Sequence, residues 1–227
     1  MTDARAAPRR YRNISDLPAV IPVFPLTGVL LLPRTRQPFH IFEPRYLAMV
    51  DAAMDEYRLI GIVQPRNAGE DMAKKPALAD VGCVGRITDY SETDDGRYLI
   101  TLTGICRFHV SGEREATTPY RQVAADYTLF AEDLLSKEDP PIARERLLAA
   151  LKPYLSDRSM QTDWKSIQEA PAETLVNALC MLCPFEPSEK QALLEAPGLG
   201  ERADALIALI EIANASAMPS GGSPSIN

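Results

Sequence analysis

Cys180 and Cys183 have the one spacing in this sequence that is typical of metal or redox chemistry. A Cys-x-x-Cys pair can be a redox couple or half of a zinc site. A zinc site needs two further ligands, and Cys83, Cys106 and both histidines lie in the other half of the chain. The pair also ends an apolar helical stretch at 172–183, where Cys packs as a small hydrophobe, whereas redox pairs favour helix N-termini. We therefore expect reduced, buried, metal-free thiols and no cofactor.

The other reactive residues form no catalytic motif. His40 and His109 lie in separate strand candidates, without a neighbouring constellation. The sequence has no Gly-x-x-x-x-Gly-Lys-Ser/Thr phosphate loop, no Gly-x-Ser-x-Gly elbow and no His-Glu-x-x-His. The acidic residues at 132–139 are bounded by prolines, which is typical of a solvated linker. The residues alone indicate a protein that is not an enzyme.

Charge and aromatic residues divide the chain into two halves. Of its 227 residues, 1–130 hold 16 basic and 16 acidic side chains, and 131–227 hold 8 and 15, which accounts for the net charge of -7. Twelve of the 15 aromatic residues lie before residue 131. Neither half is basic enough to make nucleic acid a favoured partner. No apolar stretch approaches the ~18 residues of a membrane span. The N-terminus lacks a secretory signal, so we expect a cytoplasmic protein, with a monomer as the favoured state.

Short apolar segments broken by prolines and glycines predict strands in the first half. Val20–Pro33 reads as two extended segments around a turn at Thr27-Gly28, followed by strand candidates at 37–42 and 58–64. Asp94-Asp-Gly96 predicts a hairpin. In its second strand, alternate residues from Tyr98 to Val110 are apolar, while Thr101, Thr103, Arg107 and His109 share the other face. A three-and-four spacing after Pro44 predicts one helix at 44–56.

After Pro141 the apolar spacing is helical throughout. Glu186-Pro-Ser-Glu189 predicts a capped helix start. The chain is therefore α+β. We expect a flexible tail at 1–19, a strand-rich subdomain at 20–130, a linker at 131–139, a helical subdomain at 140–215 and a disordered tail at 216–227.

An ordered series of motifs resembles the N-terminal, substrate-binding domain of Lon proteases. It begins with Ile21-Pro-Val-Phe-Pro-Leu26, Leu31-Leu-Pro33 and Phe39-x-Ile-Phe-Glu-Pro-Arg-Tyr46, and continues with Val81-Gly-Cys-Val-Gly-Arg-Ile87 and Leu102-Thr-Gly-Ile-Cys-Arg-Phe108. Pro119-Tyr120, Glu189–Glu195 and Arg202 extend it over about residues 20–213. The resemblance implies a β-rich, PUA-like pseudo-barrel followed by a helical bundle. Because the chain stops near the end of that domain, we expect neither ATPase nor protease activity.

The resemblance also implies recognition of unfolded or tagged polypeptide, in proteolysis-related quality control. Two apolar runs carry more apolar surface than short strands easily bury, and such patches often mark partner sites. We therefore predict polypeptide binding by Val29, Leu30, Leu31, Leu32, Phe39, Ile41 and Phe42. The alternatives are that these runs are core, that the protein is a partner-specific regulatory module, or that a PUA-like fold binds nucleic acid.

Overall fold

The computed structural model describes residues 11–67, 75–135, 140–158 and 163–217. The chain forms two compact units, one of residues 1–137 with 185–194, the other of residues 138–184 with 195–227. The class is α+β, as the sequence predicts. The expected tails, at 1–10 and 218–227, and positions 136–139 of the expected linker lie outside the described residues.

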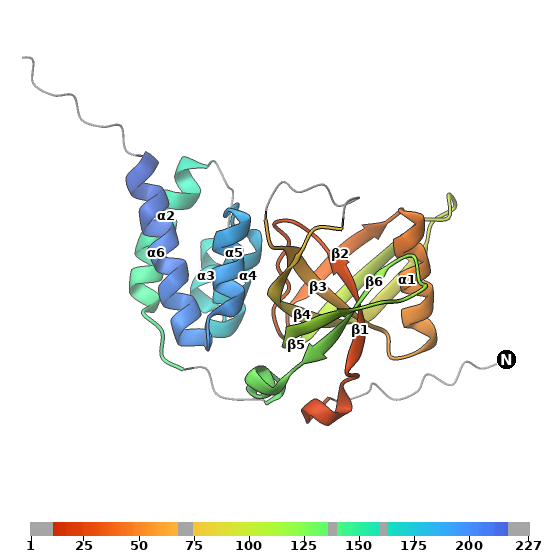
Figure 1. Ribbon diagram of the computed structural model, residues 1–227. Helices are drawn as coiled ribbons and strands as arrows, with labels where there is room; N and C mark the ends of the chain where they lie inside the picture. The colour runs from red at the N-terminus through yellow and green to blue at the C-terminus, as the bar shows by residue number, and fades with distance from the viewer. Residues whose placement is uncertain (1–10, 68–74, 136–139, 159–162, 218–227) are drawn as a thin grey trace, which may run out of the picture. The chain divides into compact units, whose positions relative to one another are not determined.

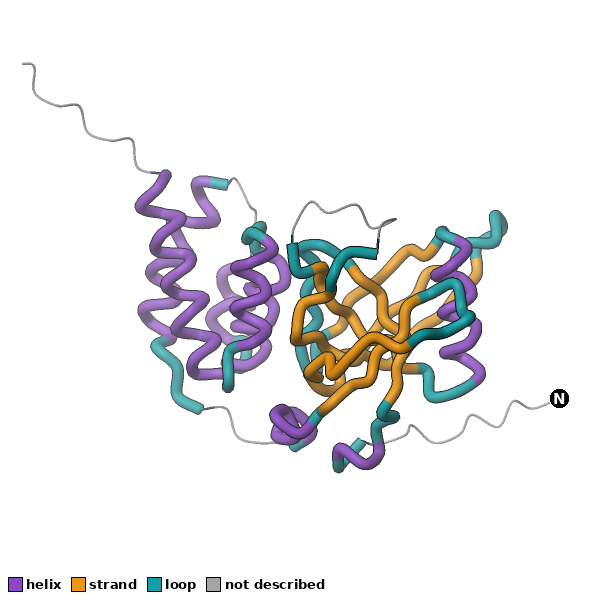
Figure 2. Tube along the Cα trace, viewed as in Figure 1, coloured by secondary structure: helices purple, strands orange, loops and turns teal. Residues whose placement is uncertain are grey.

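The first unit contains all six described strands in one mixed sheet (Figures 1 and 2). The strands are β1 (Val20–Pro25), β2 (Arg36–Ile41), β3 (Leu59–Pro65), β4 (Leu78–Glu92), β5 (Tyr98–Arg114) and β6 (Arg121–Asp126). They follow the order β2-β5-β4-β3-β1-β6, and β6 pairs with β5 to close a ring of five. Only β1 and β3 run parallel. Of these strands, β2 alone has a single neighbour.

Helix α1 (Pro44–Asp55) lies against β1 and β3, as the spacing after Pro44 predicts. The turn at Thr27-Gly28 is also confirmed, with Gly28 at a φ of 72°, but only the first extended segment there is a strand. The tail expected at 1–19 is ordered from Tyr11 onward. Tyr11 and Leu17, on either side of the short helix η1 (Ile14–Asp16), are buried because their apolar side chains pack into the core.

The barrel interior is filled by Phe108, which needs two glycines beside it. Its ring is fully buried, and a Cβ at Gly82 or Gly61 would lie 2.6 or 3.0 Å from its terminal ring carbon. Gly82 pairs with Phe108 across β4 and β5. The glycines therefore make room for an aromatic side chain in the barrel.

A second glycine pair, Gly85 and Gly104, lies in close contact with the segment that precedes β2. The two residues are partners across β4 and β5. A Cβ at Gly104 would lie 2.0 Å from the carbonyl oxygen of Leu32, and one at Gly85 would lie 2.7 Å from Leu31 Cδ2. The Gly104 N–H donates to the Thr35 carbonyl at 2.9 Å. The strand backbone is thus in direct contact with the chain that covers it.

The second unit is helical in every element described. It holds α2 (Arg144–Asp157), α3 (Trp164–Glu169), α4 (Ala172–Leu182) and α6 (Leu199–Ala217), and α6 packs against α2 and α4. No strand occurs in the described residues after 140, in agreement with the helical spacing. The Asn177 side-chain oxygen accepts a hydrogen bond from Arg202 at 3.3 Å inside this unit.

Helix α5 (Pro187–Glu195) was expected in the helical subdomain at 140–215. Residues 185–194 belong instead to the unit that contains the strands. Gln64 of β3 donates to the Pro187 carbonyl and to Gln191, each at 3.0 Å. Gln191 in turn donates to the Val81 carbonyl. The predicted helix start is present, since the Glu189 carboxylate accepts the Glu186 N–H at 2.8 Å. Buried amide hydrogen bonds, which sequence spacing does not reveal, place this helix.

We predict that Gly104→Ala destabilises the protein severely, whereas Gly112→Ala on the same strand does not. The added methyl at 104 meets a backbone carbonyl that has no room to move, while nothing lies within 4 Å of a Cβ at 112. Overpacking typically costs about 1 to 3 kcal/mol, and we expect the upper end here because the obstacle is backbone. Urea unfolding followed by circular dichroism measures both variants. Equal unfolding midpoints for the two would contradict the close approach.

Candidate functional site

The structure places four of the seven predicted binding residues in the core. Leu30, Leu31 and Leu32 are at most 2% exposed, and Leu31 and Leu32 contact the Gly85–Gly104 pair. Ile41 is also buried, on the inward face of β2. These four side chains are too buried to contact a ligand. For them, the alternative that the apolar runs form core is correct.

The remaining three predicted residues differ in exposure. Val29 and Phe39 are half-buried. The Phe39 ring lies 5.7 Å from that of Phe24, which itself packs on Tyr46 at 4.3 Å. Phe42 follows β2 and is 59% exposed, with its ring 6.1 Å from that of His40. Phe42 is therefore the predicted residue that is most available for binding.

Exposed side chains of β2 and β5 share one face of the sheet near Phe42. We define the β2 edge surface as Pro38, His40, Phe42 and Leu99, whose side chains share one face of the sheet. Strand register places His40 opposite Leu99, and Leu99 opposite Ser91. Leu99 is 46% exposed, whereas Tyr90 pairs with the buried Ile100 and lies on the other face. An open hollow of about 630 Å³ is lined by residues of all three strands, among them Pro38, His40, Tyr90 and Leu99.

Leu99 is a residue of this surface that the sequence did not predict. Leu99 shares the outward face of β5 with Thr101 and Thr103, so an apolar residue stands where polar residues are expected. An apolar residue on this otherwise polar strand face could have indicated an exposed apolar site from the sequence.

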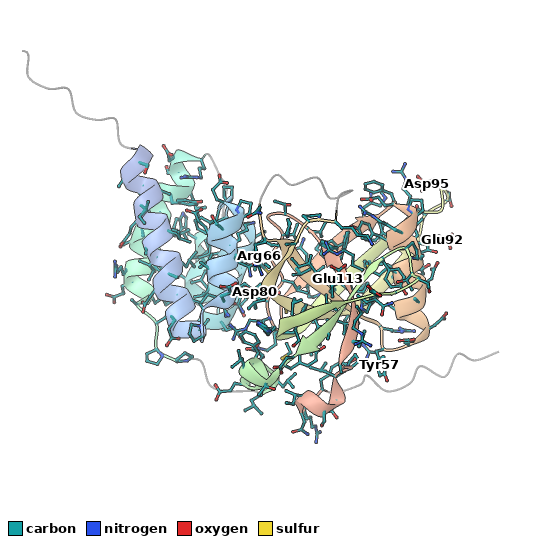
Figure 3. The ribbon with its side chains drawn as sticks, viewed as in Figure 1. Tyr57, Arg66, Asp80, Glu92, Asp95 and Glu113 are labelled. Carbon is teal, nitrogen blue, oxygen red and sulfur yellow. The ribbon has the colours of Figure 1, made fainter. Side chains whose placement is uncertain are left out.

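The β2 edge surface carries little net charge. Arg36 and Asp89, next to it, form an ion pair at 2.5 Å and compensate each other. Beneath it, Tyr98 donates to Asp51 of α1 at 2.9 Å, and this hydrogen bond raises the pKa of Tyr98. The Tyr90 ring lies 5.1 Å from that of Tyr98. Glu92 and Asp95, at the turn end of the same hairpin, are labelled in Figure 3.

The middle of β5 is fixed by Arg107, which the alternation predicts to face water. Its side chain is instead buried against the short helix η3 (Thr128–Leu134). The guanidinium donates to both Asp133 carboxylate oxygens at 2.9 Å and to the Leu194 carbonyl at 3.0 Å. It also lies 4.5 Å from the centre of the Phe130 ring. Asp133 is therefore half of a buried ion pair, which corrects its assignment to a solvated linker.

The cysteines are four buried free thiols. Burial raises the pKa of Cys106 to about 12, and its Sγ donates to the Phe130 carbonyl at 3.3 Å. Cys180 lies in the last turn of α4 and Cys183 is its C-cap residue, so the Cys-x-x-Cys pair lies at a helix C-terminus. Within the described ranges, no group of three His, Cys, Asp or Glu side chains could hold a metal. The described helices include none long and apolar enough to cross a membrane.

Taken together, these features define an α+β domain whose best candidate site is an apolar surface. The family model described as "ATP-dependent protease La (LON) substrate-binding domain" matches residues 20–211. The chain belongs to this family.

Curated relatives and solved structures agree with that assignment. The chain is 28% identical to Lon protease 2 of Myxococcus xanthus over 133 residues, which cover 59% of this chain and 16% of that protein. It is 25% identical to Lon protease of Parabacteroides distasonis over 210 residues, 87% of this chain and 24% of that protein. The chain thus spans a quarter or less of these relatives.

Two solved structures show the same fold. A Lon N-terminal domain protein from Xanthomonas campestris matches with a TM-score of 0.58 at 21% identity, covering 83% of this chain and 97% of that one. The N-terminal domain of Mycobacterium avium complex Lon protease matches with a TM-score of 0.57 at 16% identity, covering 84% and 97%.

We predict that Asp133→Ala lowers the free energy of unfolding by about 3 to 5 kcal/mol, because it leaves the Arg107 guanidinium buried without its carboxylate. Asp80→Ala is the matched control. It removes an ion pair with Arg66 in which both side chains are more than half exposed, and should cost less than about 1 kcal/mol. Urea unfolding compares the two. A similar small loss for both would show that the buried pair is unimportant.

We also predict that no thiol of the native protein reacts rapidly with a thiol reagent at about pH 8, while all four react after denaturation. Because the pKa of Cys106 is raised on folding, the free energy of unfolding should fall as the pH rises above the ordinary thiol pKa. The stabilisation by the protonated thiol is complete below 9.0, the pKa of Cys106 in the unfolded chain, and is lost as the pH rises towards about 12. Metal analysis should find no stoichiometric zinc. A fast native thiol, or one zinc per chain, would contradict this assignment.

Proposed function

We propose that this protein is a non-catalytic module that binds unfolded or extended polypeptide through the β2 edge surface, in proteolysis-related quality control in the cytoplasm. The observation that carries the proposal is the exposed Leu99 in the wall of the 630 Å³ hollow, together with the exposed Phe42, whose ring lies 6.1 Å from that of His40 in the same wall. Membership of a family described as a substrate-binding domain supports it. A group of exposed apolar side chains on a domain is typical of a partner site.

We expect a bound polypeptide to lie across the side chains of the β2 edge surface, not to pair with the β2 backbone as an added strand. β2 has one neighbouring strand, so its other side could in principle pair with an added strand. Pro38, in the middle of β2, has no N–H to donate and interrupts such pairing. An extended chain would therefore lay apolar side chains on Phe42 and Leu99 instead of extending the ladder.

Weak binding driven by apolar burial follows from this geometry. The flanking Arg36–Asp89 pair is internally compensated, so the surface gives little attraction to either sign of charge. Screening by salt weakens only the Coulomb part of binding. Affinity should change little with added salt, whereas a nucleic-acid complex would lose affinity steeply.

We predict that Phe42→Ser with Leu99→Ser weakens binding to a permanently unfolded test protein about tenfold or more. Leu129→Ser is the matched control. Leu129 is 77% exposed on η3 of the same unit but lies outside the β2 edge surface, so its loss should leave binding unchanged. Fluorescence anisotropy of the labelled test protein, at low and high salt, measures the dissociation constants, and circular dichroism checks folding.

Two results would count against the proposal. Unchanged affinity of the folded double variant would place the binding site elsewhere. No binding even at about millimolar concentration, near -4 kcal/mol, would favour the alternative of a partner-specific regulatory module.

A further inference from the structure

A second cavity, of about 440 Å³, lies where the end of β1, the first turn of α1 and the β5–β6 connection meet. Its volume is in the usual range of ligand pockets. It shares no lining residue with the hollow of the β2 edge surface. Glu113, labelled in Figure 3, marks the end of β5 in its wall. We call it the Tyr46 pocket.

The Tyr46 pocket is locally cationic on a protein of net charge -7. Its charged lining residues are Arg45, Lys75, Arg114 and Arg121 with Glu113 and Glu115. Arg121 forms a two-point ion pair with Glu113, at 2.8 and 2.6 Å, and Arg45 pairs with Glu43 just outside the lining at 2.7 Å.

One positive charge of this lining is left uncompensated. Among the residues that the structure describes, the side chains of Arg114, Lys75 and Glu115 have no ion-pair partner. Two cations therefore face one carboxylate. A ligand with a single negative charge would balance the pocket.

Tyr46 adds an uncommitted hydrogen-bond donor. Its side chain is only 5% exposed, and burial raises the pKa of its hydroxyl. That hydroxyl has no hydrogen-bond partner in the described part of the chain, yet no buried polar side-chain atom described there is unsatisfied. The hydroxyl must therefore reach accessible space, and the cavity that Tyr46 lines provides it.

We propose that the Tyr46 pocket binds the C-terminal carboxylate of a polypeptide. The carboxylate accepts hydrogen bonds from the Tyr46 hydroxyl and the Arg114 guanidinium, and Glu115 accepts an N–H from the last residues of the bound chain. A charged hydrogen bond of this type is among the stronger polar contacts in proteins. The proposal rests on the proposed function in one respect, that the ligand is polypeptide.

The mixed charge of the wall selects this ligand over a polyanion. A nucleoside polyphosphate or a nucleic-acid backbone brings several negative charges against Glu113 and Glu115, which repel them. A peptide end brings one carboxylate together with N–H donors, so it matches both signs present in the wall. The apolar side chains of Pro25 and Pro119 complete the lining.

The test uses one unstructured peptide with an N-terminal fluorophore in two forms, a free C-terminal acid and a C-terminal amide. Anisotropy titration of the full chain should give about tenfold weaker binding for the amide. Added salt should narrow this difference. Acetate, as a competitor, should displace the acid peptide poorly, because it lacks the N–H donors.

Variants then locate the effect. Tyr46→Phe keeps the ring that packs on Phe24, and Arg114→Gln alters a side chain exposed on the pocket wall. Each should weaken the acid peptide and leave the amide unchanged. Arg97→Gln, an exposed arginine on the β4–β5 turn, is the control and should affect neither peptide.

The outcomes separate this inference from the proposed function. Phe42→Ser with Leu99→Ser should weaken both peptides equally, and failure of that result alone would count against the proposed function. Equal binding of acid and amide, absence of binding by both, or equal loss of both with Tyr46→Phe would overturn the carboxylate site. Competition by acetate as strong as by the unlabelled acid peptide would overturn the peptide part of the assignment.

Discussion

The buried guanidinium of Arg107 sets how the strand-rich unit is assembled. It stands in the middle of β5, and its partners come from η3 and from the last turn of α5, far apart in sequence. A charge removed from water is costly unless its carboxylate and carbonyl partners are in place. The barrel, the segment that leaves it and the helix that returns to it must therefore adopt one mutual arrangement. That requirement explains why residues 185–194 group with the strands.

Close backbone approach is the second constraint. Gly82 and Gly61 admit Phe108 into the barrel, and Gly85 and Gly104 admit the chain at Leu31 and Leu32. The most apolar run of the sequence is thereby used as core. What remains for a ligand is the opposite face of the neighbouring strands, where Leu99 and Phe42 stay exposed because no described element covers them.

The two candidate sites differ in the force that each would use. The β2 edge surface offers apolar area with compensated charge, and the Tyr46 pocket offers one surplus positive charge with a free hydroxyl. A polypeptide has chemistry for both, since it brings apolar side chains along its length and one carboxylate at its end. Membership of a family described as substrate-binding makes polypeptide the natural ligand to test at each.

The sequence by itself determined the class of fold, the helix at 44–56, the hairpin at Asp94–Gly96, the helical second half and the family, because periodicity, turn residues and ordered motifs are local properties of the chain. It also named Phe42, which the structure leaves exposed, as a candidate for binding. Only the tertiary structure decided that Leu30–Leu32 are core, that Asp133 is a buried partner and that α5 belongs with the strands. An apolar run or a charged side chain has the same local signature whether it ends in the core or at the surface. Its fate depends on contacts with residues distant in sequence, such as Gly104 for Leu32 and Arg107 for Asp133.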